Sequence, residues 1–88
     1  MLQPDFLKTV SHSPGIYMML DKKSVLYVGK AKDLHKRLSS YSRFSGPAHN
    51  KTTVMLAQVV KVDTIITHTE KEALILEASL IKKHKPKY

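Results

Sequence analysis

Apolar and polar positions alternate along the chain in a pattern that predicts three β-strands. Residues 15–20 (GIYMML) and 24–29 (SVLYVG) are rich in aliphatic and aromatic residues and flank a polar turn at 21–23, as expected of a β-hairpin. Residues 61–68 (KVDTIITH) are rich in β-branched residues and form the third expected strand. Together with the predicted helices, these strands indicate an α+β domain, a small three-stranded antiparallel β-sheet flanked by helices.

Helical periodicity and capping residues predict four helices around this sheet. Residues 4–10 form a short helix with a proline in its first turn. Asp33 is the expected N-cap of the second helix, in which Leu34 and Leu38 face the core. Residues 52–60 are predicted to be the third helix, after a loop rich in small and polar residues.

The last helix, residues 69–84, combines a clear start signal with a carboxylate on its apolar side. Thr69 followed by Glu72 is a capping box. The arc that we expect to be buried consists of Ala73, Leu74, Leu76, Leu80 and Ile81. Glu77 lies in the middle of this arc, where a carboxylate costs free energy unless a basic side chain, hydroxyls or a metal ion pairs with it. A buried salt bridge or a position at the rim would also explain it.

The register of the hairpin decides whether Tyr17 and Tyr27 share one face of the sheet. If Met19 faces Val25, both phenols lie on the same side. If Leu20 faces Val25, a slip of one residue places them on opposite sides. The sequence leaves both registers open. A site that uses both phenols requires the first register or a β-bulge that corrects the parity.

The composition is that of one folded domain of 88 residues, and it excludes several kinds of site. The chain contains no cysteine, which excludes disulfides, thiolate metal sites and a cysteine nucleophile. No apolar run approaches the length of a membrane span, and the N-terminus lacks the apolar core of a signal peptide. We therefore expect a soluble, cytoplasmic protein with no membrane partner.

Charge is the most informative bulk property. Fifteen Lys and Arg residues against seven Asp and Glu residues give a formal net charge of +8. The excess gathers in two clusters: Lys30, Lys32, Lys36, Arg37, Arg43 and Lys51 in the middle, and Lys82, Lys83, Lys85 and Lys87 near the end. Such clusters favour a polyanion, most simply DNA, through counterion release. An acidic membrane surface or a merely solvated face are the alternatives.

The same region carries the groups that a nuclease needs. A carboxylate-bound divalent metal, a base and cationic side chains can together activate a water and stabilise a phosphodiester transition state. The candidates are Glu77, the phenols of Tyr17 and Tyr27, and the cations Lys30, Lys32 and Arg37. A single carboxylate favours one hydrated Mg²⁺ or Mn²⁺ ion, whereas the five histidines show no zinc-ligand spacing. Each group also has an ordinary explanation in core packing or surface solvation.

Several ordered motifs resemble a known family. Pro14-Gly15-Ile16-Tyr17 and then Tyr27-Val28-Gly29-Lys30-Ala31-Lys32, with Arg37, resemble the GIY-YIG nuclease superfamily. The fuller pattern adds KRLSSY at 36–41, EALILE at 72–77 and PKY at 86–88. It is similar to one branch, the N-terminal nuclease domain of the excinuclease subunit UvrC, over nearly the whole chain.

The resemblance implies roles for individual residues. Glu77 matches the glutamate that holds the single catalytic metal, and Arg37 matches the arginine at the scissile phosphate. Tyr17 and Tyr27 match the two motif tyrosines, of which Tyr17 is the expected general base or water-positioning residue, with Lys30 or the metal lowering its pKa. Lys32 and Tyr41 match residues that border the site and contact DNA.

The resemblance also implies a role within a larger protein, and two alternative functions stay open. We expect the domain, residues 1–88, to be part of a larger repair nuclease that makes the 3′ incision in damaged duplex DNA. A helicase-like partner would load the damaged strand through regions outside this chain. Asp33 and His35 depart from the Asn and the Lys or Arg that the family commonly has there, which reduces positive charge. The alternatives are a stand-alone nuclease of recombination or mobile elements, and a basic DNA-binding module without catalysis.

Overall fold

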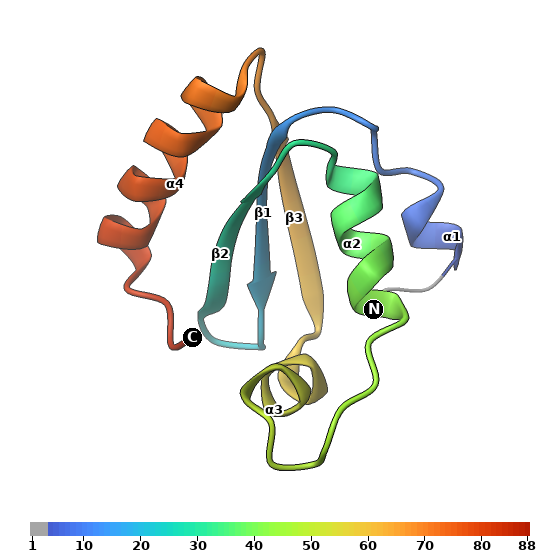
Figure 1. Ribbon diagram of the computed structural model, residues 1–88. Helices are drawn as coiled ribbons and strands as arrows, with labels where there is room; N and C mark the ends of the chain where they lie inside the picture. Colours follow the sequence, from blue (N-terminus) through green and yellow to red (C-terminus); the bar gives the residue numbers. More distant parts are fainter. Residues whose placement is uncertain (1–3) are drawn as a thin grey trace.

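The computed structural model describes residues 4–88, and all seven predicted elements are present in it (Figure 1). They are α1 (Pro4–Leu7), β1 (Gly15–Leu20), β2 (Val25–Ala31), α2 (Leu34–Ser42), α3 (Lys51–Gln58), β3 (Lys61–Ile66) and α4 (Glu70–His84). The strands form one antiparallel sheet in the order β2-β1-β3, which confirms the predicted fold class. β2 begins one residue later and ends two residues later than expected, so Lys30 lies within the strand.

Helices cover both faces of the sheet. Figure 1 shows α4 on one side and α1 and α2 on the other, with α3 below one end of the strands. The larger apolar cluster lies on the α1–α2–α3 side and contains Val10, Tyr17, Met19, Leu26, Leu34, Leu38, Met55 and Val62. The smaller cluster lies beneath α4 and contains Ile16, Val25, Val28 and Ala73. β1 supplies residues to both clusters because alternate side chains of a strand point to opposite faces.

A β-bulge sets the register of the hairpin. Leu20 pairs with Val25, but the register shifts between Met19 and Leu20, so that Met19 pairs with Tyr27 rather than with Leu26. Leu26 is the extra residue, and it packs in the larger cluster on the same side as Tyr27. Without the shift, the Leu20 register would place the two motif phenols on opposite faces.

The bulge therefore corrects the parity, as one of the predicted alternatives requires. Tyr17 pairs with Gly29, two residues after Tyr27, so Tyr17 and Tyr27 are diagonal neighbours on one face. Their ring centroids are 5.9 Å apart. The prediction that both phenols share one side of the hairpin is confirmed.

The start of α4 follows the capping prediction with one variation. The Thr69 hydroxyl accepts a hydrogen bond from the Glu72 N–H at 3.1 Å. The Glu72 carboxylate accepts from the N–H of His68 at 3.1 Å, one residue before the N-cap. The side chain of Glu72 therefore ties the residue that precedes the N-cap to the first turn of the helix.

The buried side of α4 is narrower than the predicted arc. Ala73 is buried, and Leu76 and Leu80 are half-buried against the smaller cluster. Leu74 and Ile81 are 52% and 42% exposed, so the prediction that they are buried is wrong. The physical reason is that α4 packs mainly against β2 and β1, and this contact covers a narrow stripe of the helix. Glu77 lies half-buried at the edge of this stripe.

No helix within residues 4–88 has the length and apolarity that crossing a membrane would require.

Gly29 is required where the two tyrosines meet. A Cβ at Gly29 would lie 2.5 Å from Cζ and Oη of Tyr17, whose side chain is 1% exposed and has no room to move. We predict that Gly29→Ala lowers the free energy of unfolding by about 1–3 kcal/mol through overpacking. Gly46→Ala is the control, because there the nearest atoms belong to the partly exposed ring of Phe44. Urea denaturation measures both, and equal stabilities of the two variants would contradict the prediction.

Candidate active site

Three tyrosines form the centre of the candidate site, between the sheet and α2. The ring centroids of Tyr17 and Tyr41 lie 5.9 Å apart in an edge-to-face arrangement, and their hydroxyl oxygens are 3.0 Å apart, at hydrogen-bonding distance. Tyr41 reaches this position because Leu34 and Leu38, on the same side of α2, are fully buried and fix the rotation of the helix. Tyr27 and Tyr41 remain half-buried, whereas Tyr17 is 1% exposed.

The environment of Tyr17 disfavours ionisation. Burial raises the pKa of its phenol far above the ordinary value, and the hydrogen bond with Tyr41 adds to the effect. The positive charge of Arg37 opposes it only in part. The raised pKa favours the neutral phenol at Tyr17, and the use of Tyr17 as a general base stays a prediction that depends on a further positive charge such as a bound metal ion.

Tyr27 is the phenol on which the charges of the site converge. Burial is the main cause that raises its pKa, followed by Tyr41, and the negative charge of Glu77 also raises it. The Tyr17 hydroxyl and the positive charge of Arg37 act in the opposite direction. Glu77 from α4 and Arg37 from α2 are therefore both close enough to influence one phenol on β2.

Glu77 itself has the features of a carboxylate available for a cation. It is half-buried, and within residues 4–88 its oxygens make no hydrogen bond or ion pair with protein groups. A buried salt bridge, one of the explanations considered from the sequence, is thus absent from the described residues. The same residues contain no group of three or more His, Cys, Asp and Glu side chains that could hold a metal ion. One unpaired carboxylate fits a hydrated Mg²⁺ or Mn²⁺, which takes few protein ligands.

A basic pocket lies beside these groups. It has a volume of about 540 Å³ and is lined by Lys30, Ala31, Lys32, Asp33, Lys36, Arg37 and Ser40. The four cations of this basic pocket come from the end of β2, the connection that follows and the outer side of α2. Such a surface can contact several phosphates of a strand. Arg43 lies apart from it, as the exposed C-cap of α2.

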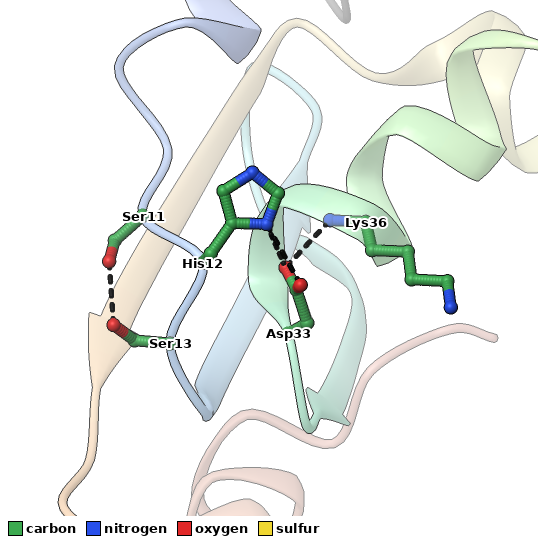
Figure 2. Close-up of polar contacts among 5 residues, drawn as sticks. All are labelled: Ser11, His12, Ser13, Asp33 and Lys36. Carbon is green, nitrogen blue, oxygen red and sulfur yellow. Dashed lines mark hydrogen bonds and ion pairs between the residues drawn. The ribbon is translucent and has the colours of Figure 1, made fainter.

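Asp33 holds the start of α2 within this basic surface. Its carboxylate accepts the N–H of Lys36 at 2.9 Å, which confirms the predicted N-cap. Figure 2 shows His12 pointing at the same carboxylate. Its Nδ1 lies 2.8 Å from Oδ2 of Asp33, and the rings of His12 and His35 lie 4.2 Å apart. Sequence analysis missed this pair because 21 residues separate the partners and no local pattern links them.

An aromatic pocket of about 470 Å³ adjoins the site on another side. It is lined by Tyr27, Tyr41, Lys51, Thr52, Met55, Lys87 and Tyr88. Tyr27 and Tyr41 line this aromatic pocket and, together with Tyr17, form the tyrosine cluster. Lys51, a predicted DNA contact, also lines the pocket. Tyr88 and Met55 were not predicted as site residues, because only the tertiary fold brings the end of the chain next to α3.

Comparisons with known proteins agree with this geometry. Residues 13–88 match the family model of the UvrC-like GIY-YIG domain. UvrABC system protein C of Desulfotalea psychrophila is 66% identical over the whole chain, and that of Photobacterium profundum is 57% identical over 94% of it. The chain spans only 15% and 14% of the length of these two relatives.

Solved structures show the same fold. The GIY-YIG N-terminal endonuclease domain of UvrC from Thermotoga maritima, bound to magnesium as its catalytic divalent cation, is 38% identical, with a TM-score of 0.82. The match covers 96% of this chain and 91% of that domain. A point mutant of the same domain, also bound to its catalytic divalent cation, superposes with a TM-score of 0.83.

The cap at Asp33 predicts a pH-dependent contribution to stability. The hydrogen bond from His12 and then the Lys36 N–H lower the pKa of the Asp33 carboxyl. Its contribution to stability is therefore present above the ordinary pKa of about 3.9 and is lost as the pH falls through the lower folded-state value. We predict that Asp33→Asn, which keeps the capping oxygen, is slightly less stable than the wild type at pH 7.

Urea midpoints at pH 7 and pH 3 measure this effect. The difference between the wild type and Asp33→Asn should be smaller at pH 3 than at pH 7, whereas Asp33→Ala, which removes the cap, should stay less stable at both pH values. A difference between wild type and Asp33→Asn that is unchanged at pH 3 would contradict the ion-pair explanation.

Proposed function

This chain belongs to the UvrC-like GIY-YIG domain family, and from that premise we propose that it is a divalent-metal-dependent endonuclease domain that hydrolyses a phosphodiester bond of DNA. The observation that carries the proposal is the half-buried carboxylate of Glu77, which has no protein partner among residues 4–88 although the chain has a net charge of +8. The negative charge of Glu77 raises the pKa of Tyr27, and the positive charge of Arg37 lowers it. The charges of Glu77 and Arg37 thus both influence the phenol of Tyr27, and Arg37 also lines the basic pocket.

The residues divide the work as follows. Glu77 would hold Mg²⁺ or Mn²⁺, and the cation would supply positive charge that neutralises the phosphate and favours deprotonation of water and phenol. Arg37 contacts the scissile phosphate and stabilises the charge that develops on it. Lys30, Lys32 and Lys36 bind the strand in the basic pocket. Further along the DNA, outside the basic pocket, the contacts are made by Tyr41, Arg43 and Lys51.

Tyr27 is better placed than Tyr17 to accept the proton of the attacking water. Tyr27 is half-buried and can contact a water molecule, whereas Tyr17 is enclosed. The pKa of Tyr27 is raised as well, mainly by burial, but the Tyr17 hydroxyl and Arg37 oppose this shift. In this arrangement Tyr17 is a positioning residue, because its hydroxyl joins Tyr41 and its ring packs beside Tyr27.

The wider context is part of the proposal. The chain corresponds to a small part of its UvrABC system relatives, so we propose that it acts within a longer protein on damaged duplex DNA in the cytoplasm. There it would make the 3′ incision of nucleotide excision repair, after a helicase-like excinuclease subunit, which binds elsewhere in that protein, has presented the strand.

The carboxylate can be tested by an isosteric change. We predict that Glu77→Gln lowers the rate of nicking of supercoiled plasmid in Mg²⁺ or Mn²⁺ by about a hundredfold or more, because the metal loses its charged ligand. Glu70→Gln is the control, since it makes the same change at an exposed position on the same helix. Full activity of Glu77→Gln would contradict the metal role. DNA binding without nicking by the wild type in either metal would instead favour the non-catalytic module.

The two phenols can be distinguished in the same assay. We predict that Tyr27→Phe lowers the nicking rate by about a hundredfold or more, in the range of a lost general base. Tyr17→Phe removes the hydroxyl contact with Tyr41 and the influence of that hydroxyl on Tyr27, and it should cost less than about tenfold. Near-ultraviolet circular dichroism checks that both variants are folded. If Tyr17→Phe is the more damaging change, Tyr17 is the base after all.

A further inference from the structure

We propose that the aromatic pocket binds one unstacked nucleobase of the strand that is cut. The inference rests on the proposed function, because it assumes that the strand lies across the basic pocket and the tyrosine cluster. It adds a second requirement, namely that a base next to the scissile phosphate leaves the stack and enters the space between α2, α3 and the end of the chain.

The lining of the pocket suits a planar, apolar group that is attached to a phosphate. Tyr27, Tyr41 and Tyr88 supply aromatic rings, and the buried Met55 supplies an apolar side chain. Lys51 and Lys87 are exposed and bring positive charge to the same pocket. Bases stack on aromatic side chains in proteins that bind single strands, with little preference for sequence. The volume of about 470 Å³ falls within the usual range for small-ligand sites.

The ring of Tyr88 is held in place from both ends. Its backbone N–H donates to the carbonyl of Leu26 at 2.8 Å, and its hydroxyl accepts from Nε2 of Gln58 at 2.8 Å. The ammonium of Lys87 lies 5.6 Å from the centre of the same ring. Because Tyr41 is also fixed by its hydroxyl contact with Tyr17, two of the three rings are ordered before any ligand binds. Such preorganisation lowers the entropic cost of stacking.

The two pockets differ in a way that orients the strand. The basic pocket is lined by four cations and no aromatic ring, whereas the aromatic pocket contains three rings and two cations. Arg37 and Tyr41 lie one turn apart on α2, with Arg37 lining the first pocket and Tyr41 the second. A strand can therefore place its phosphates along the basic pocket and one base in the aromatic pocket, which Tyr27 also lines.

A binding assay without metal tests this inference independently of cleavage. The probes are a fluorescein-labelled oligothymidylate of about twelve nucleotides and an abasic strand of equal length and charge, both in a chelator-containing buffer. We expect the wild type to bind the oligothymidylate about tenfold more tightly than the abasic strand, because only the former can stack. Equal affinities would overturn the inference, while plasmid nicking would still report on the proposed function.

Variants that fill or empty the pocket locate the effect. Thr52→Phe should occupy the space and reduce the base preference to less than about twofold, with the affinity for the abasic strand unchanged. Val54→Phe is the control, because it adds a similar ring at an exposed position of α3 outside the pocket. Tyr88→Leu removes a ring instead and should also reduce the preference, which keeps the test valid if Thr52→Phe does not fold. A preference that survives both changes places the base elsewhere.

A spectroscopic readout identifies the site directly. Addition of deoxythymidine monophosphate to protein with ¹³C-labelled methionine methyl groups should shift the resonance of Met55 through the ring current of the bound base. Met19, which is fully buried in the same cluster but does not line the pocket, should not shift. A shift of neither methyl group, or of Met19 alone, would contradict binding in the aromatic pocket.

Discussion

The arrangement of the site depends on a single irregularity, the β-bulge at Leu26. Strand pairing close to the turn follows the register in which Leu20 faces Val25, and continued along the hairpin this register would send Tyr17 and Tyr27 to opposite faces. The extra residue restores the parity and turns both Leu26 and Tyr27 toward α2 and α3. Gly29 then leaves room for the Tyr17 ring.

Around this framework, some carboxylates accept hydrogen bonds from the protein and others do not. Asp33 and Glu72 both cap helices, and their oxygens are occupied by backbone N–H groups. Glu77 is half-buried and has no such partner within residues 4–88, at the edge where α4 meets β2. A partly desolvated carboxylate without hydrogen bonds costs free energy unless a ligand compensates for it. Asp33 and Glu72 thus support the fold, and Glu77 is the carboxylate to which we assign chemistry.

The two pockets indicate how a DNA strand lies across the site. Lysines gather where β2 leads into α2, and aromatic rings gather where α3 and the end of the chain meet β2. Tyr27 and Tyr41 line the second pocket and form a cluster with the buried Tyr17. Such a surface suits a single strand, because the phosphates can contact the lysines while one base stacks on the aromatic rings. This view joins the proposed endonuclease activity to the proposed base pocket, and the two can still fail separately.

The sequence by itself determined the elements, because their signals are local. The caps at Asp33 and Thr69, the apolar strands and the family motifs all lie within short windows, and the structure bears out the elements that they predicted. The width of the buried face of α4 was overestimated at Leu74 and Ile81, because burial depends on what a helix packs against. Only the tertiary structure decided the bulge, the enclosure of Tyr17, the pair of His12 with Asp33 and the pocket at Tyr88. Each of these depends on contacts between residues far apart in the chain, for which periodicity and propensity carry no signal.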